Sequence, residues 1–341
     1  MLPRNLLLSA SAAAALTLGA CSDSSAAEAV TLSGSGASFP APLYQTWFAE
    51  YGKSHPNRVN YTSKGSSGGK KDVIEGIVDF GASDSAMKDE EIAKVDRGIQ
   101  LLPMTAGGVV LIYNLDNVRD LKLSRDSLAG IYLGEITKWN DDRIKADNAG
   151  VALPDVAIQP VYRADGSGTT FCFSNHLAAA SQKWQSGPGA GESLNWPVGT
   201  GGKKNDGVAA LVKQTPGAIG YVELSFAKTA GMPMASLQNK AGKFVAPSIA
   251  NFQAALAGAT LPANMRTFLP DPDGEQSYPI VTYTWILAYK SYPKAKLDAF
   301  KDAMRWCLTT GQGMSEKLGY VPLPEAVTSK VIAALDQLQA K

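Results

Sequence analysis

Hydrophobic residues along the chain follow two spacings. At helical spacing they recur as Leu43, Trp47 and Tyr51 after Pro40, and again on one face of a late segment at 297–308. Short runs rich in β-branched and aromatic residues predict strands at 59–61, 77–81, 108–113, 159–162, 218–222 and 280–288. Strands that alternate with helices are typical of the α/β class. The pattern therefore predicts an α/β fold.

The length of 341 residues predicts two domains, at roughly 100–200 residues per domain. Ser124 and Asn205 each begin a further predicted helix. The segments 108–113 and 280–288 are the best-formed long strands, and each lies next to a change in composition. We expect both to cross between the domains, so that the first lobe is built from both ends of the chain. The predicted bounds are 30–112 plus 283–341 for lobe 1 and 113–282 for lobe 2.

The N-terminus has the pattern of a secretory signal. An apolar stretch at 6–19 follows a basic residue and is too short to span a bilayer as a helix. The end of this stretch overlaps the segment 18–21 (LGAC), which resembles a bacterial lipobox with Cys21 as the lipid attachment residue. Cleavage after Ala27 without a lipid is the alternative. Both predict a periplasmic or otherwise exported protein, which touches a membrane only through the lipid. The predicted signal peptide and tether are 1–20 and 21–29.

Charge and composition exclude several classes of protein. Lys and Arg total 32 and Asp and Glu total 31, so the formal net charge is +1. A nucleic-acid-binding protein is expected to carry a basic excess or stripe instead. The two histidines argue against zinc chemistry or a His-rich catalytic site. We therefore expect no nucleic-acid partner, no metal and no cofactor. Cys172 and Cys307 are expected to be buried free thiols, with a disulfide as the alternative.

Four loops rich in Gly and Ser carry the candidate chemistry, at 33–39, 64–69, 79–84 and 163–170. The first leads into the helix after Pro40, and the second is expected to lead into a helix around 71–76. The third follows the strand at 77–81, and the fourth leaves a strand for an apolar helix. Helix N-termini offer unpaired backbone N–H groups and a positive dipole end, both of which favour an anion. A single loop of this kind is more typical of N-capping, but three together with the guanidinium of Arg163 favour an anion site.

Asp84 is unusual in such a site. A carboxylate repels a bound anion unless the anion has a proton to donate. Hydrogen phosphate has one near neutrality, because its second pKa is about 6–7, whereas sulfate has none. Asp84 would accept a hydrogen bond from P–OH and would repel sulfate. Asp165 is expected to orient Arg163, and a capping role is the alternative for Asp84.

Five segments together resemble the PstS family, the phosphate-binding proteins of bacterial phosphate ABC importers. Each segment is weak alone, but their order and spacing are specific, and the resemblance covers nearly the whole mature chain. The family implies a two-lobed periplasmic-binding-protein-like fold (type II), with two domains joined by two crossing strands. The segments are GSGASFPAP (34–42), GSSGG (65–69), DFGASD (79–84), RADGSGTT (163–170) and GTGGKKNDGVAALVKQTPGAIGYVE (199–223).

The resemblance also implies the site and the partners. Hydroxyls and backbone N–H groups would donate to phosphate, Asp84 would accept its proton, and Arg163 would pair with the anion while Asp165 restrains it. Two departures are Ser38, where Thr is common, and Lys204, where Gly is common. The implied partners are inorganic phosphate and the membrane permease subunits of a phosphate ABC transporter, with the receptor a monomer. The implied phosphate-binding residues are Ser38, Phe39, Ser66, Asp84, Arg163, Asp165, Ser167, Gly168 and Thr169.

Three alternatives come from other classes of protein. The segment 65–69 matches G-x-S-x-G, so Ser67 could be the nucleophile of a serine hydrolase or phosphatase. No suitable base is apparent, because His176 is expected in a helix and His55 in a loop, and no G-x-x-x-x-G-K-[ST] motif is present. We therefore expect a protein that is not an enzyme. A structural surface lipoprotein, or a receptor for another tetrahedral oxyanion such as sulfate or molybdate, remains open.

Overall fold

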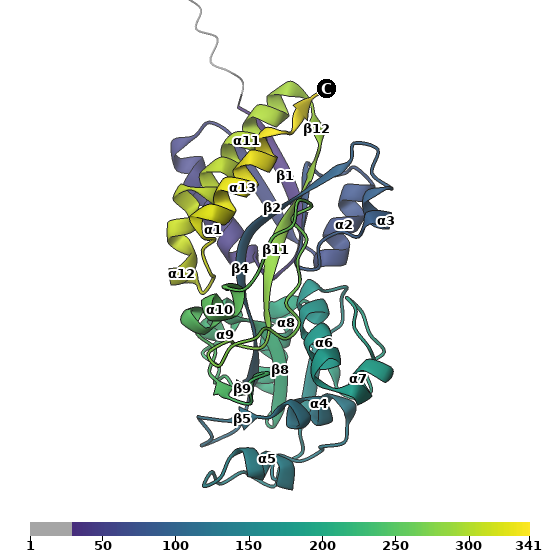
Figure 1. The fold of residues 1–341 in the computed structure, drawn as a ribbon, viewed down its shortest axis with the longest axis vertical. Helices are drawn as coiled ribbons and strands as arrows, with labels where there is room; N and C mark the ends of the chain where they lie inside the picture. Colours follow the sequence, from purple (N-terminus) through teal and green to yellow (C-terminus); the bar gives the residue numbers. More distant parts are fainter. Residues whose placement is uncertain (1–28) are drawn as a thin grey trace, which may run out of the picture.

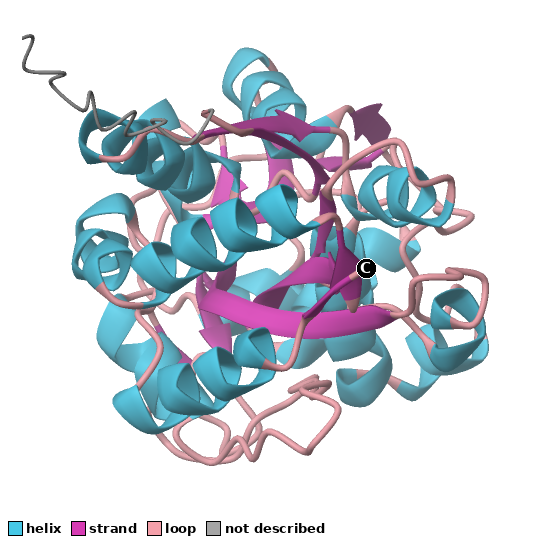
Figure 2. Cartoon of the chain, turned by 90° about the horizontal axis from the view of Figure 1, so that it is seen from above, coloured by secondary structure: helices cyan, strands magenta, loops and turns pink. Residues whose placement is uncertain are grey.

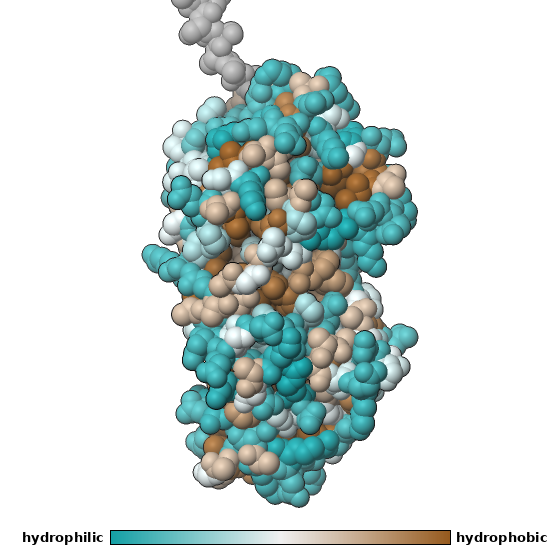
Figure 3. All heavy atoms as spheres, viewed as in Figure 1, coloured by the Kyte–Doolittle hydropathy of each residue, from teal (hydrophilic) through white to brown (hydrophobic). Residues whose placement is uncertain are grey.

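Residues 29–341 are described by the computed structural model and form two lobes, one above the other in Figure 1. The upper lobe contains the first strands and the last helices of the chain, and the lower lobe contains its middle part. The molecular outline narrows between the lobes (Figure 3). The predicted signal peptide, Cys21 and nearly all of the predicted tether lie outside the described residues. Within those residues, no helix has both the length and the apolar character needed to cross a bilayer.

One eight-stranded sheet runs through both lobes, in the order β2-β1-β3-β11-β4-β8-β6-β7. The first three strands are parallel to one another, and β11 lies antiparallel to both β3 and β4. The strands are β1 (Thr31–Gly36), β2 (Arg58–Ser63), β3 (Phe80–Ser83), β4 (Ile99–Tyr113), β6 (Gln159–Arg163), β7 (Thr200–Gly202), β8 (Ala218–Glu223) and β11 (Val281–Tyr289). Two small sheets are formed by β5 (Lys122–Leu123), β9 (Ser236–Gln238) and β10 (Phe244–Val245), and by β12 (Ser291–Tyr292) and β13 (Gln339–Ala340).

β4 is the strand that belongs to both lobes. It pairs with β11 as far as Gly108 and with β8 from Val109 onward, so the sheet of the upper lobe continues into the lower one. An α/β fold with a strand passing between two lobes agrees with the fold expected from the sequence. The lobe bounds at 112/113 and 282/283 stay a prediction.

Helices surround the strands when the molecule is viewed from above (Figure 2). In the upper lobe α1, α2 and α13 contact the sheet, and in the lower lobe α6, α8 and α9 do so. The upper helices are α1 (Ala41–Ser54), α2 (Ser66–Ile74), α3 (Asp89–Ile92), α11 (Lys294–Leu308), α12 (Ser315–Leu318) and α13 (Glu325–Asp336), with the 3₁₀ turn η1 (Thr310–Met314). The lower helices are α4 (Arg125–Leu133), α5 (Asp142–Asp147), α6 (Gly168–Ala180), α7 (Gln182–Ser186), α8 (Lys204–Gln214), α9 (Leu224–Ala230) and α10 (Ile249–Leu256).

Most predicted strands are confirmed to within two residues, as β2, β6, β8 and β11. The strand predicted at 108–113 is the second part of β4, which begins earlier, at Ile99. The strand predicted at 77–81 is wrong, because Ile77 is 62% exposed and the strand, β3, begins at Phe80. Residues 80–83 are therefore the strand itself and not a loop that follows one.

Two other expectations fail for reasons of backbone geometry. Residues 33–36, expected in a loop, belong to β1, whose small residues make room for β3: a Cβ on Gly34 would lie 2.1 Å from the Phe80 ring. The helix expected around 71–76 begins earlier, at Ser66, because Gly65 turns the chain with a φ of 89°. A side chain would make that conformation costly.

The core contains the predicted hydrophobic faces. Leu43, Trp47 and Tyr51 of α1 are buried, and Tyr44 stacks on Trp47. The face of α11 is buried as its spacing predicts. Cys172 lies in α6 of the lower lobe and Cys307 in α11 of the upper lobe. Both are buried free thiols, as expected from the sequence, so the disulfide alternative is wrong.

Gly69→Ala is expected to lower the free energy of unfolding by about 1–3 kcal/mol. A Cβ at this position of α2 would lie 2.6 Å from Gly36 Cα and 2.7 Å from the carbonyl oxygen of Ala82, and backbone cannot yield as a flexible side chain does. Gly258→Ala is the matched control, because a Cβ there meets nothing within 4 Å. Urea unfolding followed by circular dichroism measures the difference. Equal stability of the two variants would show that α2 moves away from the sheet without cost.

Candidate anion-binding site

Polar side chains from both lobes meet at the junction between the lobes. The upper lobe contributes Ser38, between β1 and α1, Ser66, at the start of α2, and Asp84, directly after β3. The lower lobe contributes Arg163, at the end of β6, and residues 167–169, at the start of α6. All of these residues are buried. The structure thus brings together residues that are up to 131 positions apart in the sequence, since Ser38 and Thr169 are both included.

Glycines allow the two lobes to touch at this point. A Cβ on Gly168 would lie 2.5 Å from Ser66 Oγ and 2.7 Å from Asp84 Oδ2. A Cβ on Gly65 would lie 2.5 Å from Asp165 Oδ2. Side chains at either position would therefore separate the loops of the upper lobe from the loop 163–169 of the lower lobe.

Arg163 is held in one orientation by Asp165. Its Nε donates to Asp165 Oδ1 at 2.9 Å and its Nη2 to Oδ2 at 2.5 Å, the two-bond arrangement that suits a guanidinium and a carboxylate. A third bond runs from Nη1 to Thr169 Oγ1 at 3.2 Å. Burial alone would raise the pKa of Asp165, but the Arg163 bonds and the Lys204 N–H hold it below its usual value. A guanidinium has five N–H donors, so two of them remain for a ligand.

Asp84 is a buried carboxyl with a shifted pKa. Burial raises the pKa to about 7, against the opposing effects of the Thr284 hydrogen bond and the charge of Arg163. Thr284 Oγ1, on β11, donates to Asp84 Oδ1 at 2.7 Å, and the Asp84 N–H donates to Ser66 Oγ at 3.2 Å. Near neutral pH this carboxyl therefore gains and loses a proton readily.

Three helices begin at or within three residues of the cluster, and these are α1, α2 and α6. The N-cap residues of the first two, Pro40 and Gly65, make no side-chain cap. In α6 the hydroxyl of Ser167 accepts a bond from the Thr170 N–H at 3.0 Å. The capping alternative thus describes Ser167, but not the starts of α1 and α2, where backbone N–H groups remain without a side-chain cap.

Sequence reasoning missed three polar residues at this junction, which are Asn205, Thr284 and Tyr320. Asn205 Nδ2 donates to Ser38 Oγ at 2.9 Å and to Thr169 Oγ1 at 3.2 Å. The Tyr320 hydroxyl donates to the Phe39 carbonyl at 2.7 Å and fixes the peptide before α1. A polar residue inside an apolar strand was the available signal for Thr284. Asn205 was interpreted only as the beginning of a helix, and nothing in the sequence singled out Tyr320.

Lys204 departs from the family pattern at a position that needs an unusual backbone. Its φ is 61°, in the left-handed region that Gly adopts freely and other residues adopt at a cost. Its N–H donates to Asp165 Oδ1 at 2.8 Å. The left-handed turn therefore directs one more donor to the carboxylate that orients Arg163.

Glu192 forms a second contact between the lobes. It follows α7 in the lower lobe, and its Oε1 lies 2.5 Å from Lys70 Nζ of α2 in the upper lobe. The hydroxyls of Ser67 and Ser85 also donate to its carboxylate. Burial would raise the pKa of Glu192, but Lys70 and the two hydroxyls hold it below its usual value. The carboxylate is thus an ionised bridge between the lobes.

These contacts leave Ser67 without a histidine base. His55 stacks on Tyr51 at the end of α1, and the Nδ1 of buried His176 lies 2.9 Å from the carbonyl oxygen of Pro270. Neither histidine contacts Ser67, whose hydroxyl is bound to Glu192. Within residues 29–341, no group of three or more His, Cys, Asp or Glu residues could hold a metal ion. The hypothesis that Ser67 is the nucleophile of a serine hydrolase or phosphatase therefore has no support in the geometry.

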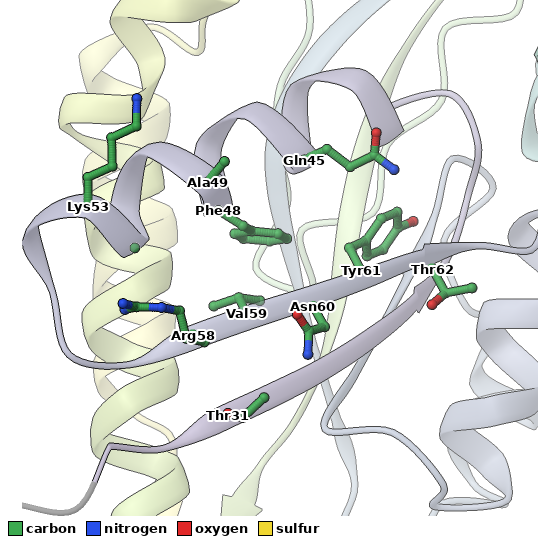
Figure 4. Close-up of a pocket in the computed structure, with 11 residues that line it drawn as sticks. Thr31, Gln45, Phe48, Ala49, Lys53, Arg58, Val59, Asn60, Tyr61 and Thr62 are labelled. Atoms are coloured by element: carbon green, nitrogen blue, oxygen red, sulfur yellow. The ribbon is translucent and has the colours of Figure 1, made fainter.

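A groove of about 640 Å³ lies elsewhere, between α1 and the edge strand β2 (Figure 4). Phe48 and Tyr61 form its floor, and Lys53 and Arg58 lie toward one end of it. None of the predicted site residues lines this groove. Groove size is therefore a poor guide to function in this molecule, because the convergent polar groups are in the closed junction.

The chain is similar to known proteins over most of its length. A model described as a PBP superfamily domain matches residues 22–304. A protein from Pasteurella multocida named phosphate-binding protein PstS is 44% identical over 311 residues, which cover 90% of each chain. The chain belongs to the PstS family of the PBP superfamily. The resemblance inferred from the five motifs is confirmed.

Solved structures of similar fold include proteins named for phosphate. One is a high-affinity periplasmic phosphate-binding protein (PfluDING) bound with phosphate, with a TM-score of 0.73, 20% identity and coverage of 89% of this chain and 93% of that one. Another is a putative phosphate ABC transporter substrate-binding protein from Clostridium perfringens, with a TM-score of 0.64, 20% identity and coverage of 86% and 100%. The two-lobed fold expected for this PstS family member is confirmed.

The pair Lys70–Glu192 is expected to stabilise the closed molecule by about 1–3 kcal/mol in a double-mutant cycle with Lys70→Ala and Glu192→Gln. Its side chains are only 6% and 19% exposed. The matched control is Lys71–Glu75 on the same helix, 72% and 48% exposed, for which about 0.3 kcal/mol is expected. Urea unfolding gives both coupling energies. A coupling for Lys70–Glu192 no larger than the control would show that this pair does not hold the lobes together.

Proposed function

We propose that the chain binds inorganic phosphate outside the cytoplasmic membrane and delivers it to the permease of an ABC-type phosphate importer. The observation that carries the proposal is one guanidinium and one carboxyl of raised pKa, buried together among hydroxyl groups from two lobes. The identity of the ligand, inorganic phosphate, is inferred from the names of the family relatives. The proposed ligands are the side chains or backbone N–H groups of Ser38, Phe39, Ser66, Asp84, Arg163, Ser167, Gly168 and Thr169, with Asp165 as the partner that orients Arg163.

Charge balance supports an anion that carries one proton. Arg163 is already neutralised by Asp165, so neutral donors must supply much of the binding of a dianion, as fixed donors do in other buried anion sites. Asp84 accepts bonds and, when ionised, donates none. Phosphate with one proton satisfies that carboxylate, because the P–OH group can donate to it.

The proposal describes a receptor and not an enzyme. The molecule acts as a monomer, with lobe 1 at 30–112 plus 283–341 and lobe 2 at 113–282, and closes on its ligand about the strands between the lobes. It is periplasmic or otherwise exported. Cys21 is the proposed lipid attachment residue of a membrane-anchored form, and no nucleic acid or cofactor takes part.

Isothermal titration of the purified chain with phosphate, arsenate and sulfate tests the function. We expect one site per chain, micromolar or tighter affinity for phosphate, competition by arsenate and much weaker binding of sulfate. Arg163→Ala should weaken phosphate binding by about 100-fold or more, because it removes one partner of a buried charge pair. Absence of binding to every tetrahedral anion would contradict the proposal and favour a structural surface protein.

The preference for phosphate over sulfate is expected to fall as the pH drops from about 8 to about 5.5. Below its pKa of about 7, Asp84 carries a proton that it can donate to sulfate, and above it the carboxylate repels sulfate. Asp84→Asn should remove most of the preference at the higher pH. Asp79→Asn is the control, because Asp79 is a buried carboxyl that pairs with Lys296 away from the site. Competition titrations at both pH values measure the ratio, and an unchanged ratio in Asp84→Asn would exclude Asp84 as the discriminating group.

A further inference from the structure

Asn205 lies outside the proposed ligand set but joins two of its hydroxyl groups. Its side chain is fully buried at the start of α8. Nδ2 donates to Ser38 Oγ at 2.9 Å and to Thr169 Oγ1 at 3.2 Å, and its backbone N–H donates to Ser38 Oγ at 3.3 Å. Ser38 belongs to the upper lobe, whereas Asn205 and Thr169 belong to the lower one. The carboxamide therefore connects the two lobes at the site.

The orientation of this carboxamide is determined by a backbone group. Its Oδ1 accepts a bond from the Glu223 N–H on β8 at 2.9 Å. A backbone N–H can only donate, so the oxygen must face β8 and the NH₂ group must face the hydroxyls. Both hydrogens of that NH₂ group are then used, one for each hydroxyl oxygen.

The two hydroxyls have no remaining capacity to accept. A hydroxyl has two lone pairs and one hydrogen. Ser38 Oγ accepts from the side chain and the backbone of Asn205, and Thr169 Oγ1 accepts from Asn205 and from Arg163 Nη1. Each oxygen has thus filled both lone pairs. Within residues 29–341, no hydrogen bond uses either O–H group as a donor. What each hydroxyl still offers is one O–H.

We propose that Asn205 is a positioning residue that fixes Ser38 and Thr169 as hydrogen-bond donors toward the bound anion. The inference rests on the proposed function and extends it. Donors that are already oriented lose no free energy to reorientation when the ligand binds, which favours affinity. Because the bonds to Ser38 cross between the lobes, this orientation is complete only in the closed molecule. Closure of the lobes therefore also completes the orientation of the Ser38 and Thr169 hydroxyl donors.

The position also limits how many protons the ligand can bring. Ser38, Thr169 and Arg163 can only donate, so they offer no acceptor to a ligand O–H, whose hydrogen must point to another group. Asp84 is the carboxyl of the site that can accept a ligand proton, whereas Ser66 Oγ and Ser167 Oγ are neutral acceptors that each already take one backbone N–H. Asn205 in this way makes Asp84 decisive for recognition, although the two side chains make no hydrogen bond to each other in the described structure.

Asn205→Asp separates this role from simple packing. The two side chains have nearly the same shape, but a carboxylate accepts from both hydroxyls and turns their hydrogens away from the anion. We expect Asn205→Ala to weaken phosphate binding by about 10- to 100-fold and Asn205→Asp by more than about 100-fold. A packing role predicts the reverse order, because Ala leaves a cavity and Asp does not. Titration calorimetry measures both, with thermal unfolding of each variant recorded in parallel.

The control is Asn239, another fully buried asparagine of the lower lobe. Its Nδ2 donates to the backbone carbonyls of Gly274, Glu275 and Ser277, and its Oδ1 accepts from a backbone N–H. Asn239→Ala and Asn239→Asp should lower the melting temperature while leaving phosphate affinity within about threefold of the parent chain. They show what loss of a buried asparagine does when no site hydroxyl is involved.

A double-mutant cycle tests whether Asn205 acts through the hydroxyls. In a Ser38→Ala background, Asn205→Ala should cost at most about a third of the fold-loss that it causes in the parent chain. The loss in Asn205→Asp, taken as a ratio to the parent chain at the same pH, should shrink from about pH 8 to about pH 5.5, since a protonated carboxyl again presents an O–H. The other charged groups around the position, Arg163 and Asp165 from β6 and its loop, Asp84 after β3, Glu223 on β8 and the neighbouring Lys204, are common to both chains.

The outcomes distinguish this inference from the proposed function. If the parent chain binds no tetrahedral anion, the proposed function fails and the inference fails with it. If the parent chain binds phosphate but Asn205→Asp stays within about threefold of it, the inference is overturned and phosphate binding stands. The same holds if the full loss from Asn205→Ala persists in the Ser38→Ala background.

Discussion

The ion pair between Arg163 and Asp165 is the interaction on which the site depends. A buried guanidinium without a partner would be costly, and a guanidinium that could turn freely would not hold one anion geometry. Asp165 solves both problems with two bonds on one edge of Arg163, which leaves the other edge for Thr169 and a ligand. Because the pair is neutral overall, the surrounding hydroxyl and N–H groups must supply much of the binding of an anion.

Holding those groups in place requires that the two lobes meet closely. β4 carries the sheet from one lobe into the other, and glycines at 65 and 168 remove the side chains that would keep the loops apart. Glu192 and Lys70 then join the lobes next to the site. If the lobes close on the ligand as proposed, binding and closure are coupled, because these contacts exist only when the lobes touch.

Strand ends and helix starts are the parts of this site that sequence could predict. Ser66, Asp84 and Arg163 lie in Gly/Ser-rich segments at such ends, and their residue types carry the chemistry. Local sequence does not predict the β1 strand, because its Gly and Ser residues have low β propensity. A small residue is needed at Gly34 because the Phe80 ring packs directly against it. Asn205 and Tyr320 were missed because their roles come from contacts with residues 167 and 281 positions away, which no local pattern encodes.

Proton location, and not charge, separates the candidate anions. Sulfate and hydrogen phosphate have the same charge and nearly the same shape, so Arg163 and the backbone N–H groups cannot tell them apart. If Ser38 and Thr169 are fixed as donors by Asn205, they cannot accept the proton of phosphate either. The carboxyl acceptor is Asp84, whose burial brings its pKa into the range where phosphate itself titrates. A single carboxyl can then be decisive, because Ser38, Thr169 and Arg163 are committed to donate and an ionised carboxylate is the strongest acceptor among the remaining groups.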